Sequence, residues 1–376
     1  MPARETQRLR QAWIDNLRVA VIVGVIGVHV ALIYALDVGW YYQERTASTA
    51  AKVILAAVFA PGLLFGMGLL FFVAGMCTPR ALAAKGPRRF VVDRLWRLGL
   101  PIVAYVFVLN PAMNFVGDRV IGTTESVSEY FRLSFWSDVE FGVAWFITAL
   151  LLFSVGFAAW RSRHPAAVQD AVPLRRQDLV WAMVFVAVAS FAVRLVWPFL
   201  GTDALAGFNL WEYPQMVALF TLGVLAAERS WLAEGLPAEL RRFCGRAAAF
   251  SLVAAMIVAV GITLTEEPDQ FLGGLHLQAT IIPVIEAVLA VSMTLWITDW
   301  FRRRWDRASE LTRAAASASF AAYLLHAPIT IMLAAGLSDV GVPAELKFLA
   351  VFAATVLASF GLGWLLTRSH VGGRIL

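Results

Sequence analysis

Two ionisable side chains in the first apolar stretch are the strongest candidates for chemistry. Arg18 and His29 lie eleven residues apart within 15–36, which on an α-helix is about 16 Å of rise and a return to nearly the same face. Ionisable groups inside a bilayer usually face a protein interior or a wet cavity. His29 can take a proton from a hydroxyl, with a buried histidine bonded to a neighbouring helix as the alternative. On the same helix face, Arg18 could hold an anionic substrate group that leads up to His29.

A second histidine and a carboxylate extend this candidate site. His326 lies about eleven residues into a later apolar stretch, at a depth similar to that of His29, and Pro328 could open the helix there. His326 could share a site with His29, or it could have a purely structural role. Glu286 could orient an imidazole or receive its proton. Alternatively it neutralises Arg194, for which we expect a structural pair.

Arginines follow the second apolar stretch. The pattern predicts Arg88 and Arg89 in a loop, and Arg94 and Arg97 one turn apart at the start of the next helix. A phosphate would suit both the exposed helix amides and the guanidinium forks. The ordinary alternative is the excess of basic residues in cytoplasmic loops.

Composition defines the class of protein. The chain of 376 residues is 60% hydrophobic and only 15% charged, with a mean hydropathy of +0.72, whereas soluble domains are about 25% charged. We therefore predict an all-α integral membrane protein with about ten transmembrane helices. The expected spans are 15–36, 53–77, 95–115, 141–160, 179–200, 209–228, 247–265, 279–300, 316–336 and 345–367.

Basic residues predict the orientation. When Arg94 is counted with the third span, 22 Lys and Arg residues outside the spans fall in one set of segments and four in the alternate set. This bias predicts both termini in the cytoplasm and a multi-pass protein of the cytoplasmic (inner) membrane. The net charge of +5 thus reports topology, and we expect no nucleic-acid partner. Cys77 and Cys244, at inner span ends, are expected to be free thiols.

The outer side carries polar residues and one long loop. Residues that could bind a polar acceptor there are Tyr34, Asp37, Asn110, Asn114 and Glu212. The loop 116–140 includes Tyr130, Phe131 and Trp136, which suits an interfacial helix or a lid.

Four motifs together resemble the membrane-bound acyltransferase 3 family. They are Arg18 with His29, the segment LLFFVAG at 69–75, Arg94 and Arg97 followed by Pro101, and Tyr323 with His326 and Pro328. The segment 69–75 has Ala74 where the family pattern has serine. Many members carry a histidine before the Trp-Phe of the fourth helix, where this chain has Val143 and Ala144. Within the family, the sequence looks most similar to the subgroup of periplasmic glucan succinyltransferases.

The resemblance implies one transmembrane acyltransferase domain over 1–376 with no appended soluble domain. It implies an acyl-CoA donor presented from the cytoplasm, its phosphates held by Arg18, Arg94 and Arg97, with Arg88 and Arg89 nearby. His29 would deprotonate a hydroxyl of an extracytoplasmic carbohydrate, and polar groups such as His326 would stabilise the oxyanion. A covalent acyl-histidine is the competing mechanism. No metal is expected.

Two other functions remain open. A proton-coupled transporter or flippase could use His29, Glu286 and His326 as a relay, although no repeated pair of interrupted helices supports it. A catalytically silent sensor of the same fold would tolerate loss of His29.

Overall fold

The computed structural model describes residues 12–36, 38–123, 126–165, 172–201 and 207–369, and these residues form helices and loops with no strand. Ten helical segments in these ranges are long and apolar enough to cross a membrane, which confirms the all-α prediction and the number of spans. The spans consist of α1 (Ala12–Tyr34); α2 (Thr49–Phe59) and α3 (Gly66–Lys85); α4 (Pro87–Arg94), α5 (Leu100–Ala104) and α6 (Asn110–Ile121); α8 (Trp145–Arg163); α9 (Arg176–Arg194); α10 (Tyr213–Glu228); α11 (Ala238–Leu264); α13 (Ile281–Arg304); α14 (Glu310–Gly336); and α15 (Ala344–Thr367). The short helices α7 (Val127–Leu133) and α12 (Asp269–Leu272) lie between spans.

Several predicted span ends were wrong by five residues or more, and two of them have a clear physical cause. The fifth span was expected to reach residue 200, but α9 ends at Arg194. Pro198 has no N–H to donate into a helix, and Leu200 adopts a left-handed φ of 61°. The seventh was expected from 247, but α11 starts at Ala238, because charged residues are good helix formers that hydropathy overlooks.

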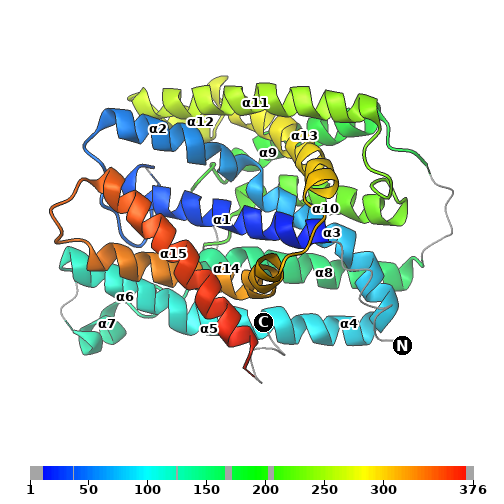
Figure 1. Cartoon of the computed structure of the whole chain (residues 1–376). Helices are drawn as coiled ribbons and strands as arrows, with labels where there is room; N and C mark the ends of the chain where they lie inside the picture. The colour runs from blue at the N-terminus through cyan, green and yellow to red at the C-terminus, as the bar shows by residue number, and fades with distance from the viewer. Residues whose placement is uncertain (1–11, 37, 124–125, 166–171, 202–206, 370–376) are drawn as a thin grey trace.

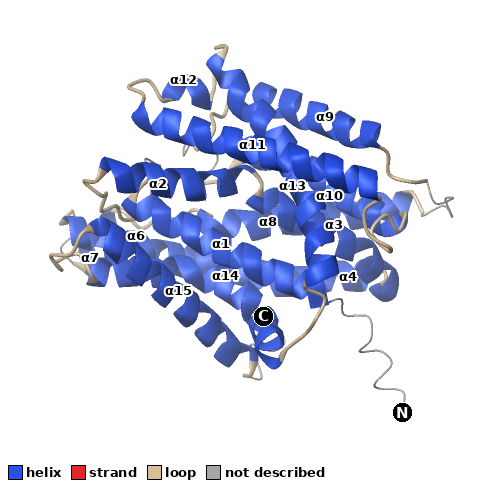
Figure 2. Cartoon of the chain, turned by 45° about the horizontal axis from the view of Figure 1, so that its top comes forward, coloured by secondary structure: helices blue, strands red, loops and turns tan. Residues whose placement is uncertain are grey.

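Helix α1 occupies the centre of the bundle. It lies between α2 and α11 on one side and α14 and α15 on the other (Figures 1 and 2). Its sequence is apolar nearly all round, which is typical of a helix that is buried on most of its faces. Ile26, Val30 and Ile33 are fully buried. The groups that α1 carries are therefore held inside the protein.

The beginning of α1 is tied to the loop that follows α13. The Asn16 side-chain amide donates hydrogen bonds to the carbonyls of Trp305, at 2.7 Å, and Arg307, at 3.1 Å. The Trp13 backbone N–H donates to Asp306 Oδ1 at 3.2 Å. These contacts fix the axial position of α1 relative to α13.

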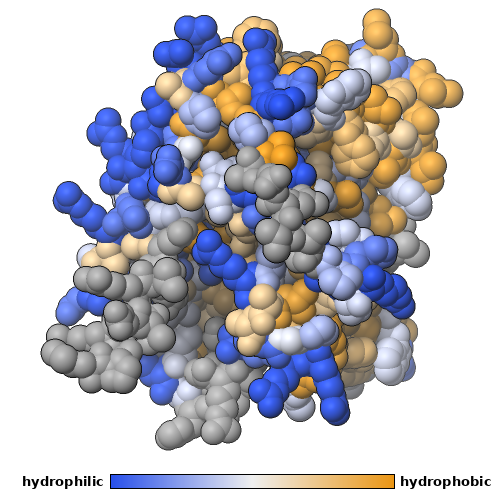
Figure 3. All heavy atoms as spheres, turned by 90° about the vertical axis from the view of Figure 1, so that its right-hand side faces the viewer, coloured by the Kyte–Doolittle hydropathy of each residue, from blue (hydrophilic) through white to orange (hydrophobic). Residues whose placement is uncertain are grey.

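The two ends of the bundle differ in polarity. We call the end at which α1 begins and α15 finishes the basic end, and the other the opposite end (Figure 1). Figure 3 faces the basic end and shows hydrophilic residues gathered over it, with hydrophobic residues toward one edge. The basic residues here include Lys85, Arg88, Arg89, Arg241, Arg242, Arg303 and Arg304.

The third span is interrupted by two wider turns. Residues Leu95–Gly99 and Tyr105–Leu109 form π-helical turns, and Pro101 and Pro111 follow them. A proline inside a helix lacks an N–H and clashes with the carbonyl four residues earlier. For both prolines that carbonyl lies within a π turn, whose wider bonding accommodates the clash. The span therefore continues past both prolines.

The predicted helix in the loop 116–140 is present as α7. Tyr130 is buried and its hydroxyl donates to Asp138 Oδ2 at 2.6 Å. Phe131 and Trp136 expose 57% and 77% of their surface. Such an exposed aromatic face at one end of a membrane bundle suits the membrane interface.

Candidate active site

A cavity of about 1000 Å³ runs along α1. At the basic end its wall includes Leu17, Trp296 and Ile297, and at the opposite end it includes Asp118 and Glu140. His29 lies in the wall between these ends. The cavity therefore follows most of the length of α1 and passes the candidate base.

The structure brings His29 and His326 together. His326 Nε2 lies 3.1 Å from His29 Nδ1, so the similar depth predicted from the sequence is confirmed. His29 Nδ1 also lies 2.9 Å from the carbonyl oxygen of Val25, and His326 Nδ1 contacts the carbonyl oxygen of Tyr323. His326 is fully buried and does not line the cavity. His326 therefore contacts the candidate base but does not reach the cavity.

These contacts select one arrangement of protons. A carbonyl oxygen only accepts, so His326 Nδ1 must carry a proton, and its neutral ring then leaves Nε2 as an acceptor. His29 Nδ1 must therefore donate, both to that nitrogen and to the Val25 carbonyl. A neutral His29 with its proton on Nδ1 has an unprotonated Nε2. The hydrogen bonds thus prepare His29 to accept a proton.

The interruption predicted at Pro328 is absent, because α14 continues as one helix from Glu310 to Gly336. The carbonyl of His326 is bonded by the hydroxyl of Thr330 at 2.7 Å. The continuous helix holds His326 rigidly behind His29.

Trp40, which the sequence analysis did not single out, covers His29. The two ring centroids lie 4.7 Å apart with an angle of 31° between the planes. Trp40 lines the cavity, and its indole N–H is buried with no hydrogen-bond partner among the described residues. A tryptophan in a loop gives no periodicity by which the sequence could place it beside an imidazole.

The loop that carries Trp40 is anchored to α1 and α15. The N–H groups of Glu44 and Thr46 donate to carbonyls at the end of α1, at 3.0 and 2.9 Å. Glu44 also pairs with Lys347 at 2.5 Å, and the Thr46 hydroxyl donates to Glu345 at 2.8 Å. These contacts hold the indole against His29.

A second set of polar groups lines the cavity toward the opposite end. The Tyr41 hydroxyl donates to Asn110 Oδ1, and Asn110 Nδ2 donates to the carbonyl of Asp138 at 2.9 Å. Gly142 packs against this pair with a φ of 45°, and a Cβ there would collide with both side chains. Asn110 and Asn114 line the cavity, as does Glu212.

The other expected acceptor residues differ in position. Tyr34 is fully buried and is not part of the wall. Asp37 lies outside the described residues. Burial raises the pKa of Asp138 and of Glu140 above the usual range of a carboxyl.

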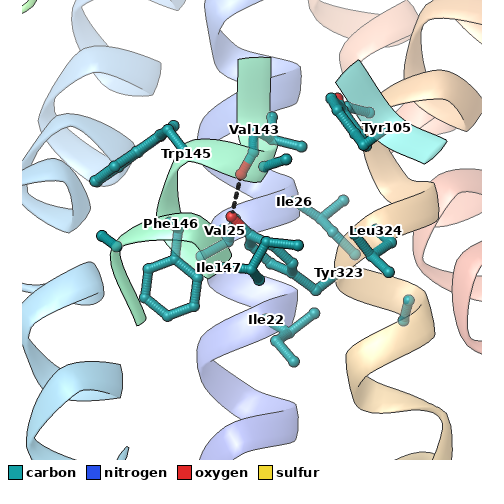
Figure 4. Packing of buried hydrophobic residues seen from close by; sticks show 14 of the residues in the cluster. Ile22, Val25, Ile26, Tyr105, Val143, Trp145, Phe146, Ile147, Tyr323 and Leu324 are labelled. Atoms are coloured by element: carbon teal, nitrogen blue, oxygen red, sulfur yellow. Dashed lines mark hydrogen bonds between the residues drawn. The ribbon is translucent and has the colours of Figure 1, made fainter. Parts of the chain in front are cut away.

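The chain uses a backbone group at Val143, where it departs from the resembled histidine motif. The Tyr323 hydroxyl donates to the Val143 carbonyl at 2.5 Å, and its ring packs against Phe146 (Figure 4). The residues from α1, α8 and α14 around this bond are buried and apolar. This contact fixes Tyr323 one helical turn before His326.

Three of the predicted arginines form a cluster at the basic end. Arg94 interacts electrostatically with Arg18 and Arg97. Arg18 Nη2 lies 3.9 Å from Cys77 Sγ, and Arg97 pairs with Asp93 at 3.3 Å. Arg94 Nε is buried without a partner among the described residues. The cluster therefore holds more cationic donors than acceptors.

The arginine cluster adjoins the cavity without lining it. The wall reaches Leu17, one residue before Arg18, but the Arg18 side chain turns to Cys77. Arg88 and Arg89 were wrongly expected in a loop: α4 begins at Pro87, after Gly86 with a φ of 73°, and both arginines are exposed on it. Proline at a first helical position has its φ already set for the helix. Arg94 and Arg97 were wrongly expected at the start of a helix, since they lie at the end of α4 and in the π turn that follows it.

Glu286 lies away from both imidazoles. It pairs with Arg194 at 2.5 Å and accepts a hydrogen bond from Gln215 Nε2 at 2.8 Å. All three side chains are buried, and none lines the cavity. The expected structural pair is confirmed, and the structure does not bring Glu286 to the histidines.

Cys77 and Cys244 are free thiols, as predicted. Within the described ranges, no group of three or more His, Cys, Asp or Glu side chains is placed to hold a metal ion.

Comparison with known families agrees with the motifs. The model of the acyltransferase 3 family, described as an acyltransferase domain, matches residues 11–368. This match includes the histidine pair, the arginine cluster and all ten spans. No curated protein matches the chain.

Proposed function

This chain belongs to the acyltransferase 3 family and is a multi-pass membrane acyltransferase, and from that premise we propose a donor, an acceptor and a mechanism. The donor is acyl-CoA, carrying an acetyl- or succinyl-type group. The acceptor is a hydroxyl of an extracytoplasmic carbohydrate or a related molecule. The protein lies in the cytoplasmic membrane with its basic end inside, in accord with the preference of cytoplasmic loops for Lys and Arg.

Charge supports the donor. Coenzyme A carries several phosphate charges, and guanidinium groups bind phosphate bidentately. Arg18, Arg94 and Arg97 lie together beside the end of the cavity at Leu17. The phosphates remain at this cluster, and the thioester at the end of the pantetheine arm enters the cavity and reaches His29.

The histidine pair supports a general-base mechanism. His29 Nε2 takes the proton of the acceptor hydroxyl as its oxygen attacks the thioester carbonyl. The C–S bond then breaks, and the thiolate leaves toward the basic end. The imidazolium on His29 is stabilised by the hydrogen bond from its Nδ1 to His326 Nε2, as a carboxylate stabilises the histidine of a hydrolase triad.

The oxyanion needs a hydrogen-bond donor, and Trp40 supplies one. His326 cannot do so, because its Nδ1 proton is engaged by Tyr323 and its Nε2 is an acceptor. The Trp40 ring lies beside His29, and its indole N–H has no partner among the described residues. Preorganised donors at a developing negative charge are among the largest contributions to catalysis.

The observation that carries this proposal is the hydrogen-bond chain from Tyr323 through His326 to His29, which leaves an unprotonated nitrogen on the base at the cavity wall. A proton relay for transport would also need Glu286, which is engaged by Arg194 and Gln215. The competing acyl-histidine mechanism uses the same His29 nitrogen as a nucleophile.

The test uses the full-length protein in liposomes with radiolabelled acetyl-CoA or succinyl-CoA added on one side. The acceptor is the pool of envelope glycans from cells that lack the gene, and mass spectrometry detects the added acyl mass. We expect wild type to acylate the pool and His29→Gln to be inactive. The matched control is His164→Gln, because His164 is exposed at the basic end. Substrate movement across the membrane without any acyl donor would contradict the proposal.

A further inference from the structure

We propose that Glu212 forms the acceptor subsite by accepting a hydrogen bond from an acceptor hydroxyl, and that it selects neutral over anionic acceptors. This inference rests on the proposed acyltransferase function and deepens it. It assigns a substrate class, a neutral polyhydroxylated molecule, to the half of the cavity at the opposite end.

The carboxylate of Glu212 is buried and incompletely bonded. The residue exposes only 3% of its surface and lines the cavity. Its Oε2 atom has no hydrogen-bond partner among the described residues. A buried carboxylate oxygen without a donor is unfavourable. A hydroxyl entering the cavity supplies the missing donor.

The surrounding charges leave Glu212 without its own counterion. Its carboxylate interacts electrostatically with Arg194 and Glu286, but the guanidinium of Arg194 is paired with Glu286 at 2.5 Å. Gln215 directs its amide N–H to Glu286 as well. Two buried acidic side chains thus share one guanidinium, and a ligand that donates hydrogen bonds is favoured over one that adds negative charge.

The charged residues of the cavity wall also favour an uncharged ligand over an anionic one. Among the described residues of the wall, the carboxylates are Asp118, Glu140 and Glu212, and no lysine or arginine is present. The arginine cluster lies outside the wall, at the basic end. Charge therefore separates an anionic donor at one end from an uncharged acceptor at the other.

The position of Glu212 fits a substrate held beside the imidazole pair. Glu212 interacts electrostatically with the hydroxyl of Tyr323, and the Tyr323 ring lies 5.6 Å from that of His326. Trp211, next to Glu212, also lines the cavity, and its buried indole N–H has no hydrogen-bond partner among the described residues. A polyol bound there would present a second hydroxyl toward His29.

The experiment measures transfer and donor hydrolysis separately in liposomes. The acceptors are the neutral and the anionic fractions of glycans extracted from cells that lack the gene. We expect wild type to acylate the neutral fraction. Glu212→Leu should lower kcat/KM for this acceptor by about tenfold or more, while hydrolysis of acyl-CoA by water continues. Glu212→Gln keeps an accepting oxygen and should retain most activity.

Controls separate this inference from loss of fold and from failure of the proposed function. Glu266→Gln, at an exposed carboxylate in a loop, should behave as wild type. Should Glu212→Leu fail to fold, Glu212→Asp keeps the charge, shortens the reach and should raise KM for the acceptor. Transfer by Glu212→Leu at the wild-type rate, or a wild-type preference for the anionic fraction, would overturn the subsite. Absence of both transfer and donor hydrolysis in wild type would instead overturn the proposed function.

Discussion

The imidazoles of His29 and His326 are joined by a hydrogen bond of 3.1 Å between side chains 297 residues apart in the chain. The bond connects the first span to the ninth, and only His29 faces the cavity. In the proposed mechanism, His326 is a positioning residue, because it sets the tautomer of His29.

Replacement of His326 should lower the rate without weakening substrate binding. His326→Ala removes the acceptor of the His29 Nδ1 proton, and we expect kcat to fall by roughly 10²-fold or more with little change in KM for acyl-CoA. His326→Gln offers an accepting oxygen and should recover part of the rate. Steady-state kinetics measure both. Equal kcat values for the Ala variant and wild type would contradict the positioning role.

The indole N–H of Trp40 should contribute to the rate independently of its ring. Trp40→Phe keeps an aromatic ring against His29 but removes the donor, so we expect kcat to fall by roughly 10²-fold while KM for the donor stays near that of wild type. Trp40→Ala should lower kcat further, because it also removes the ring that packs against the imidazole of His29. If Phe and Trp give the same kcat, the ring alone is required and another group stabilises the oxyanion.

The pair of Arg194 and Glu286 should matter for stability rather than for proton transfer. Removing one partner leaves a buried charge uncompensated, and Arg194→Met should destabilise the protein by about 3–5 kcal/mol. The double change Arg194→Met with Glu286→Met should restore much of this loss. Unfolding in detergent, monitored by circular dichroism, gives the comparison. An additive double variant would show that the two groups act separately.

Asp138 should make stability depend on pH. Burial raises the pKa of its carboxyl in the folded protein, so folding is favoured below the ordinary carboxyl pKa, and this contribution is lost as pH rises through the folded pKa. Asp138→Asn still accepts the Tyr130 hydrogen bond but does not ionise.

We therefore expect the Tm of Asp138→Asn minus the Tm of wild type to increase as the pH rises from about 4 to about 7. Thermal unfolding across this range tests the sign. A difference in Tm that stays constant with pH, or that shifts in favour of wild type as pH rises, would show that ionisation of Asp138 is not unfavourable in the fold.

Much of the fold could be predicted because its signals are local. Ten apolar stretches each contain enough residues to span a bilayer, and the ionisable residues within them stand out from their neighbours. His29, His326 and the arginines were identified in this way, as was the pair of Arg194 and Glu286. The span ends were less predictable, because α11 begins at Ala238 and includes Arg241 and Arg242, which hydropathy alone excludes from a span.

The parts that escaped prediction depend on contacts between distant segments. Trp40 is in a loop, and its place over His29 follows from bonds that anchor this loop to α15, 300 residues later. The tautomer of His29 likewise depends on a carbonyl of α14 through His326. Sequence spacing carries no information on such contacts.

The two π turns of the third span also decide which way its ends point. In an uninterrupted α-helix, Arg94 and Asn110 would be rotated by about 160° from each other. Each π turn absorbs about one additional residue, so two such turns reduce the offset to about 40°. The guanidinium beside Arg18 and the amide bonded to Tyr41 thereby come to one side of the same helix. The π turns at Pro101 and Pro111 thus let a single helix direct Arg94 toward Arg18 at the basic end and Asn110 toward Tyr41 at the opposite end.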